Sequence, residues 1–198
     1  MTFSVLVVAL LAQSSPQPEC RTSGLNQACG FHCRAELDQV RCSQTPEGFC
    51  DSLEQQLVCW DPPDEVRLHP TPASARASCH AKYREVACGY ACATSPNHLA
   101  CAQTPWGVCT TRFDRVECWD PSPAVIHHLP HAELTGAQCV QTDDVFACGW
   151  DCKTSFQQAQ CAQSPRGKCV VNEGRIACFD PPLPSITHEA ATPPPARR

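Results

Sequence analysis

The sequence predicts a small disulfide-rich, mainly β protein, built from three tandem modules of short hairpins joined by proline-rich linkers. Two observations predict this class. The chain of 198 residues contains 18 cysteines, about 9% of the total, which is close to the level that marks disulfide scaffolds. These cysteines also recur with one spacing, and their even number lets every one of them pair. They are Cys20, Cys29, Cys33, Cys42, Cys50, Cys59, Cys79, Cys88, Cys92, Cys101, Cys109, Cys118, Cys139, Cys148, Cys152, Cys161, Cys169 and Cys178.

The repeat reads C-x8-C-G-aromatic-x-C-x8-C-[AS]-Q-[ST]-P-x-G-x-C-x8-C-[WF]-D-P and occurs three times. It defines modules at residues 20–63, 79–122 and 139–182. The linkers, residues 64–78 and 123–138, are predicted to be extended, semi-rigid spacers, because proline fixes φ and lacks a backbone donor. Their apolar patches are expected to dock on a module face. Residues 183–198, which end in PPPARR, are predicted to form a disordered tail.

Each module contains three C-x8-C units, and this spacing predicts hairpins. With a two-residue turn, the two cysteines of a unit face each other as a non-hydrogen-bonded pair, with Cα atoms about 4.5 Å apart, which suits a disulfide. An apolar residue two positions before the closing cysteine indicates a strand with one face packed inward, as at Val40, Leu57, Val86, Leu99, Val116, Phe146 and Ile176. We therefore predict disulfides within the units. Pairing between units is the alternative, since six cysteines allow 15 connectivities.

The modules are too short to fold on apolar burial alone. A segment of roughly 42 residues seldom has a sufficient core, whereas each ten-residue loop closed by a disulfide would contribute about 2.7 kcal/mol on the chain-entropy model. Aromatic residues beside cysteines are expected to form the small core that remains. They occupy two columns of the repeat, Phe31, Tyr90 and Trp150 in one and Trp60, Trp119 and Phe179 in the other.

The N-terminus bears on the redox compartment. Residues Phe3–Ala12 form an apolar run about half as long as the roughly twenty residues needed to span a bilayer. We interpret residues 1–14 as a secretory signal peptide, cleaved after Ser14. Secretion favours disulfides over thiolate metal ligands. The expected location is therefore extracellular, periplasmic or in the cell envelope, with no stable membrane span after cleavage.

Charge and histidine positions exclude several functions. The net charge of −5 argues against nucleic-acid binding, which needs a basic face. No histidine recurs in register among the modules, so no Cys-His or Ser-His-Asp arrangement is indicated, and we expect neither an enzyme nor a cofactor. His127, His128 and His131 could hold a metal ion, but an extended linker does not preorganise ligands, so no metal site is predicted.

Two sets of residues are candidates for binding a partner. The segment [ST]-P-x-G predicts a β-turn whose third position differs between modules, as a contact residue on a fixed scaffold would. The other interpretation of these positions is an unconstrained turn. One glutamine is kept in all three modules, and a backbone hydrogen bond is favoured there over a ligand contact. An aspartate before proline is assigned to a turn rather than to calcium. The candidates are Glu47, Trp106 and Arg166 in the turns and Gln44, Gln103 and Gln163 beside them.

The string ACGYAC…CAQTPWGVC…VECWDP resembles an uncharacterised cysteine-rich repeat of secreted proteins from myxobacteria and related bacteria. All three modules match it, the first with Gln27 and Ser43 where the others carry different residues. The resemblance implies a bacterial origin, export and disulfides, and it carries no activity and no site.

The sequence therefore predicts a secreted, non-enzymatic protein that acts in binding, adhesion or envelope structure. Its expected partner is a protein or a glycan at a cell surface. A secreted hydrolase inhibitor that presents the [ST]-P-x-G turns is the alternative. Metal sequestration is a further one and requires reduced cysteines.

Overall fold

The computed structural model describes residues 16–72, 74–143 and 145–184. The predicted signal peptide and residues 185–198 of the predicted tail lie outside these ranges. The chain divides into two compact units, one ending at Asp61 and one starting at Pro62. The first unit thus contains the first module, and the second contains both linkers and the other two modules. Each unit is described by itself.

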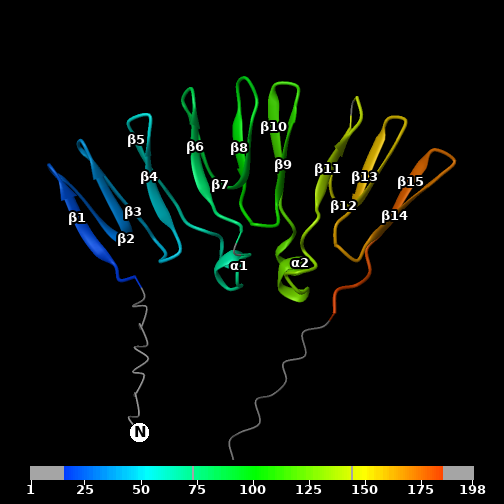
Figure 1. The fold of residues 1–198 in the computed structure, drawn as a ribbon, viewed down its shortest axis with the longest axis horizontal. Helices are drawn as coiled ribbons and strands as arrows, with labels where there is room; N and C mark the ends of the chain where they lie inside the picture. Colours follow the sequence, from blue (N-terminus) through cyan, green and yellow to red (C-terminus); the bar gives the residue numbers. More distant parts are fainter. Residues whose placement is uncertain (1–15, 73, 144, 185–198) are drawn as a thin grey trace, which may run out of the picture. The chain divides into compact units, whose positions relative to one another are not determined.

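The first unit consists of three antiparallel hairpins (Figure 1). β1 pairs with β2, β2 continues into a second hairpin with β3, and β4 pairs with β5. Cys20 faces Cys29, and Cys50 faces Cys59, as the spacing predicts. The strands are β1 (Glu19–Ser23), β2 (Asn26–Glu36), β3 (Gln39–Ser43), β4 (Phe49–Leu53) and β5 (Gln56–Trp60).

The second unit repeats this pattern twice, each time preceded by a short helix. The helices are α1 (Asp64–Arg67) and α2 (Pro123–His128). After α1 come β6 (Ser78–Lys82), β7 (Glu85–Thr94), β8 (Leu99–Ala102), β9 (Val108–Arg112) and β10 (Arg115–Trp119). After α2 come β11 (Gln138–Gln141), β12 (Phe146–Ser155), β13 (Gln158–Ala162), β14 (Lys168–Asn172) and β15 (Arg175–Phe179).

All nine disulfides close within C-x8-C units, which confirms the predicted connectivity. Their Cα atoms lie 4.0–4.1 Å apart, and none of the 18 cysteines is free. In seven of the nine hairpins, two residues separate the strand pair that closes the turn, for example Leu53 and Gln56, or Arg112 and Arg115. In the other two hairpins, the closing pairs are Thr94 with Leu99 and Gln141 with Phe146. The turn length therefore places each cysteine pair where a disulfide fits. The chain is a disulfide-rich β protein of repeated modules, as its composition and spacing predict.

A bulge lets one long strand serve two hairpins in each module. The pairing of β7 shifts register between Tyr90 and Ala93, and Ala91 there has a φ of 44°. The preceding Gly89 has a φ of 145°, and a Cβ added to it would lie 2.2 Å from the carbonyl oxygen of Ala102. Only glycine permits this close approach of two backbones. β2 and β12 shift register at the equivalent place.

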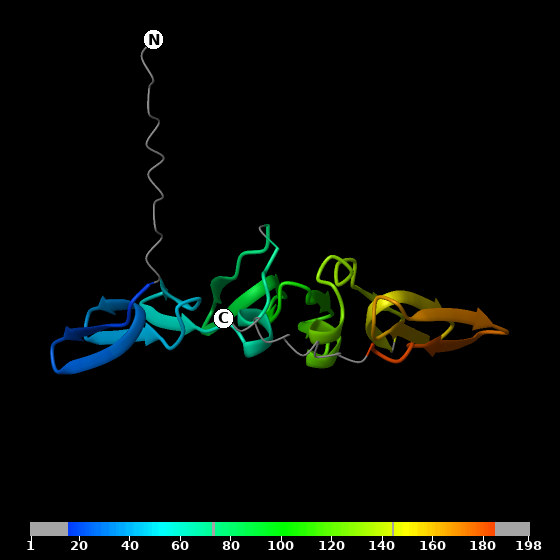
Figure 2. The same ribbon diagram turned by 90° about the horizontal axis from the view of Figure 1, so that it is seen from below.

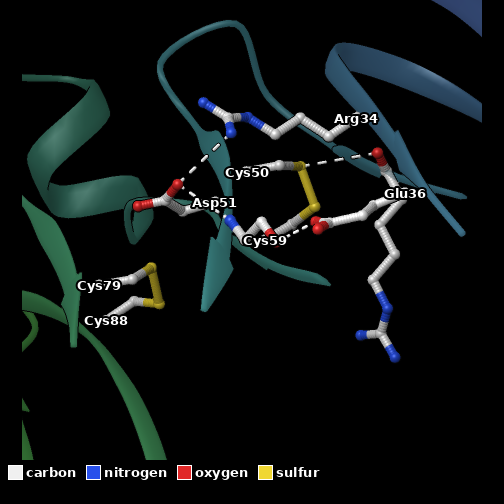
Figure 3. Close-up of polar contacts among 9 residues, drawn as sticks. Arg34, Glu36, Cys50, Asp51, Cys59, Cys79 and Cys88 are labelled. Carbon is white, nitrogen blue, oxygen red and sulfur yellow. Dashed lines mark hydrogen bonds and ion pairs between the residues drawn. A yellow bond between two sulfur atoms is a disulfide. The ribbon is translucent and has the colours of Figure 1, made fainter. Parts of the chain in front are cut away.

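Side chains join neighbouring hairpins in a module, in addition to the strand that its first two hairpins share. A side chain just after one turn accepts a hydrogen bond from the backbone N–H of an apolar residue in the next hairpin. The pairs are Gln39 with Leu57 at 3.3 Å, Glu85 with Leu99 at 3.0 Å and Gln158 with Ile176 at 3.4 Å. In the first unit, Arg34 also pairs with Asp51 at 3.5 Å, and Ser52 donates to Glu36 (Figure 3).

The predicted extended linkers are wrong at their starts, where both form short helices. Pro63 occupies the N-cap of α1, and Pro123 is the first residue of α2, whose cap Ser122 accepts a hydrogen bond from the Val125 N–H at 3.4 Å. Proline is well suited to the first turn of a helix, because its fixed φ is helical and its missing N–H has no partner there. Neither helix has the length or apolar character that crossing a bilayer requires.

The second linker supplies four of the six buried residues of the core cluster in the second unit, so the predicted docking is confirmed for that linker. In the first linker, Val66 is buried but Leu68 is 69% exposed. The two helices lie side by side (Figures 1 and 2). The core cluster consists of Trp106, Val125, Ile126, Leu129, Leu134 and Trp150. Leu183, which the sequence assigns to the tail, packs against this cluster. Phe179 was expected in a core and is 68% exposed instead, so that prediction is wrong. At the equivalent position of the second module, Trp119 is covered by Trp150 of the module that follows, whereas Phe179 has no such cover.

Candidate binding surface

The aspartate before proline holds the [ST]-P-x-G turn in each module. In the second module, the Asp120 carboxylate accepts hydrogen bonds from the Gln103 N–H at 2.9 Å, the Thr104 N–H at 2.8 Å and the Thr104 hydroxyl at 2.8 Å. A Cβ on Gly107 would lie 2.2 Å from this carboxylate, so glycine is required at that place. Asp61 holds its turn through the same three groups, and Asp180 holds the third turn through the two backbone N–H groups. The carboxylates are thus used by the fold, in agreement with a turn role.

The candidate glutamines are also used by the fold. The Gln103 side-chain amide donates to the carbonyl oxygens of Cys88 and Cys101, at 3.2 and 3.1 Å. Gln163 does the same with Cys148 and Cys161, both at 3.2 Å. Gln44 donates to the Cys42 carbonyl at 3.4 Å. The first two glutamines join the first hairpin of a module to the second, which fits the backbone role favoured from the sequence.

The third turn positions do not form a common exposed set. Glu47 is exposed, but Trp106 is only 4% exposed, so its predicted exposure is wrong. It is covered because the linker residues Val125 and Ile126 pack in the same cluster. Arg166 forms two hydrogen bonds with Glu133, at 2.8 and 3.0 Å. The hydrogen bond from Arg166 holds the pKa of Glu133 below its usual value, and the same bond raises the pKa of Arg166.

Large exposed apolar side chains lie instead at the hairpin turns. Four of them share one position, the first residue of a two-residue turn, and all four have a positive φ between 48° and 56°. Their exposed fractions are 73–88%. We call them the tip residues: Leu37, Tyr83, Phe113 and Phe156. Leu25, the second residue of another turn, is exposed as well.

This position is unfavourable for such residues on two counts. A left-handed backbone costs a residue with a side chain roughly 1–2 kcal/mol, and Asn or Gly would be the usual choice in these turns. An exposed apolar side chain also contributes no hydrophobic stabilisation to the fold. Single exposed apolar residues are common and need no explanation. Four at one strained position are a pattern, and it is not accounted for by the fold.

In the second unit, cations and hollows accompany the tip residues. Lys82 lies 6.0 Å from the ring centroid of Tyr83, and Arg112 lies 5.7 Å from that of Phe113. Two open hollows of about 330 and 360 Å³ flank Phe113, and Arg112 lines both. The turns that carry Tyr83, Phe113 and Phe156 lie at the ends of their hairpins away from α1 and α2 (Figure 1). This surface can therefore make apolar and cation–π contacts with a partner.

Sequence reasoning missed the tip residues, although a signal was present. The turn position follows from the C-x8-C spacing alone, because the fifth residue of each C-x8-C unit with a two-residue turn is the first residue of that turn. A large apolar residue there conflicts with turn propensity. That conflict, rather than conservation or charge, marks these residues.

The fold and this surface define the protein as a cysteine-rich β-repeat protein with nine disulfides. The disulfides fit an oxidising compartment outside the cytoplasm. Comparison with known protein families, with curated proteins and with solved structures finds no match. The resemblance to myxobacterial repeats therefore extends only to the cysteine-rich pattern.

Proposed function

We propose that this chain is a secreted, non-enzymatic binding or adhesion protein whose contacts with its partner are made by the tip residues of each unit. The observation that carries the proposal is the exposure of Leu37, Tyr83, Phe113 and Phe156 at a backbone conformation that disfavours them. A protein or a glycan at a cell surface is the expected partner, because apolar and aromatic side chains can bury against either.

The repeated architecture supports this role. Each disulfide-closed hairpin holds its tip rigidly, so little conformational entropy is lost when a tip residue binds. Several tips on one chain also raise each other's effective concentration at a surface. Weak individual contacts then add up to useful avidity, which suits adhesion.

A secreted hydrolase inhibitor is the second candidate, and it is less well supported. Inhibition through the [ST]-P-x-G turns needs an exposed third residue, whereas Trp106 is buried and Arg166 is bound to Glu133. Titration of a trypsin-like protease with the oxidised chain tests this candidate. Stoichiometric inhibition that Arg166→Ala abolishes would favour it over adhesion. Metal sequestration by thiolates is disfavoured because all 18 cysteines are paired.

The test of the proposed surface replaces three tip residues at once. The variant Tyr83→Asn, Phe113→Asn, Phe156→Asn removes the apolar side chains, and Asn tolerates the left-handed turn. Its matched control is Val170→Thr, Val171→Thr, Phe179→Thr, which removes three exposed apolar residues away from the turns.

The measurement is binding of labelled oxidised protein to the native cell surface, as a titration. We expect the tip variant to lose at least about tenfold in apparent affinity, because about 1.4 kcal/mol corresponds to a factor of ten. The control should change less than about twofold. Equal binding by the tip variant and the unaltered chain, or an equal loss in the control, would contradict the proposal.

A further inference from the structure

Three histidines from the two linkers meet beside the helices of the second unit. His69 follows α1, His127 lies in α2, and His131 follows α2. The His69 ring centroid lies 4.9 Å from that of His127 and 4.7 Å from that of His131. His69 Nε2 and His127 Nδ1 are 2.8 Å apart. Contact between α1 and α2 thus gathers three imidazoles from residues about 60 positions apart in the chain.

The ring of His131 is oriented as the ring of a metal ligand would be. Its Nδ1 lies 3.1 Å from the Pro70 carbonyl oxygen. A carbonyl only accepts hydrogen bonds, so in the neutral ring this nitrogen carries the proton and the lone pair is on Nε2. A hydrogen bond from the second ring nitrogen to a backbone carbonyl is the usual support of a histidine ligand. Trp106 packs on the ring, with centroids 4.7 Å apart, and helps to hold it.

The other two rings already direct nitrogens at each other. A hydrogen bond between two imidazoles needs one unprotonated nitrogen, which is also the form that binds a metal.

As the rings stand, the cluster is not a metal site: among the described residues, no group of three or more His, Cys, Asp or Glu could hold a metal ion. Metal binding therefore requires the rings to move. Two nitrogens on a tetrahedral zinc ion, each about 2.05 Å from it, lie about 3.3 Å apart. The 2.8 Å between His69 and His127 is shorter by about half an ångström, a change that small rotations of two partly exposed rings supply.

We propose that His69, His127 and His131 bind one divalent transition-metal ion, of the class that imidazole prefers, such as Zn²⁺ or Cu²⁺. The ion replaces the hydrogen bond between His69 and His127, and solvent completes its coordination. Bound there, it cross-links the two linkers, the second of which supplies four residues of the core cluster. This site is separate from the tip residues and does not depend on their role.

The sequence motif His127, His128 and His131 suggests a different ligand set, and the structure changes it. His128 Nδ1 is 2.7 Å from the Ala124 carbonyl oxygen, so its ring is directed to the backbone of its own helix. His69, from the other linker, takes its place. His128 is therefore a matched control: it is adjacent in sequence, of the same type, and outside the proposed site.

The test is isothermal titration of the oxidised chain, without a histidine tag, with Zn²⁺ alone at pH 7.5. We expect one ion per chain, and an affinity at least about tenfold lower in each of His69→Gln, His127→Gln and His131→Gln. His128→Gln should bind as the unaltered chain does. Mg²⁺ and Ca²⁺ should not bind, because they prefer oxygen ligands.

A second measurement keeps the proposal testable if a variant misfolds. The electron paramagnetic resonance spectrum of the unaltered chain with one equivalent of Cu²⁺ should show splitting from imidazole nitrogens, reduced in His69→Gln and kept in His128→Gln. Absence of stoichiometric Zn²⁺ binding, or a Cu²⁺ spectrum without nitrogen splitting, overturns the proposal. Equal losses in the His69 and His128 variants overturn it as well.

Discussion

Trp119, at the end of β10 in the second module, packs edge to face against Trp150 of the third, with ring centroids 5.2 Å apart. Its indole N–H also donates to the Gln163 side-chain oxygen at 3.3 Å. Both contacts cross from one module to the next. A residue beside the last cysteine of a module thus belongs to the core of the module that follows.

Substitution of this residue should separate the two modules. Trp119→Ala is expected to lower the free energy of unfolding of the second unit by roughly 2–3 kcal/mol, from lost burial and lost aromatic packing. Phe179→Ala changes the same column in the third module, where the side chain is 68% exposed, and should cost less than about 0.5 kcal/mol. Chemical denaturation with disulfides intact measures both. Similar losses in the two variants would show that Trp119 does not join the modules.

The left-handed backbone at the tip residues leads to a prediction about stability. Phe113→Asn should leave the stability unchanged or raise it by up to about 1 kcal/mol, because Asn relieves the left-handed strain and little buried area is lost. Phe113→Val should lower stability, since a β-branched residue fits that backbone worst. Thermal denaturation of both variants measures the sign. A clear loss in Phe113→Asn would mean that the side chain is kept for folding and not for binding.

The aspartate that holds each [ST]-P-x-G turn can be tested in the first unit. Asp61 accepts hydrogen bonds from the Gln44 N–H at 2.8 Å, the Thr45 N–H at 2.8 Å and the Thr45 hydroxyl at 2.9 Å. Asp61→Ala should cost about 2 kcal/mol and expose those amides to hydrogen exchange. Glu47→Ala, in the same turn, should leave the exchange rates unchanged. Continued protection of both amides in Asp61→Ala would contradict the assigned role.

The ion pair between Glu133 and Arg166 predicts a dependence on pH. The hydrogen bond from Arg166 lowers the pKa of Glu133 in the folded chain. The contribution of the ion pair to the free energy of unfolding is therefore fully present above 4.5, the ordinary pKa that Glu133 has in the unfolded chain. It is lost as the pH falls through the lowered folded pKa. The stability difference between the unaltered chain and Glu133→Gln should therefore be constant above pH 4.5 and vanish in stronger acid. The difference should be small and decrease with salt, since the pair is exposed. A difference that grows on acidification would contradict the sign.

The pairing of the cysteines could be predicted from the sequence because it depends only on the number of residues between them and on the length of the turn. A C-x8-C unit with a two-residue turn places its cysteines opposite each other whatever the rest of the chain does. The burial of Trp106 could not be predicted, because it depends on Val125 and Ile126 in a linker that the proline content made look extended. The histidine cluster needs contact between α1 and α2, which no local pattern contains. The exposure of Phe179 could not be predicted either, since Trp119 at the equivalent position is covered by Trp150 of the module that follows.

The turn positions and the tip residues both depend on nine locally closed hairpins. Disulfide mapping by mass spectrometry, on unreduced protein alkylated before digestion, tests this directly. The predicted result is no alkylated cysteine and nine linked pairs, each joining residues nine apart, such as Cys109–Cys118 and Cys169–Cys178. Linked peptides that join different units, such as Cys101 to Cys109, or several alkylated thiols, would contradict it.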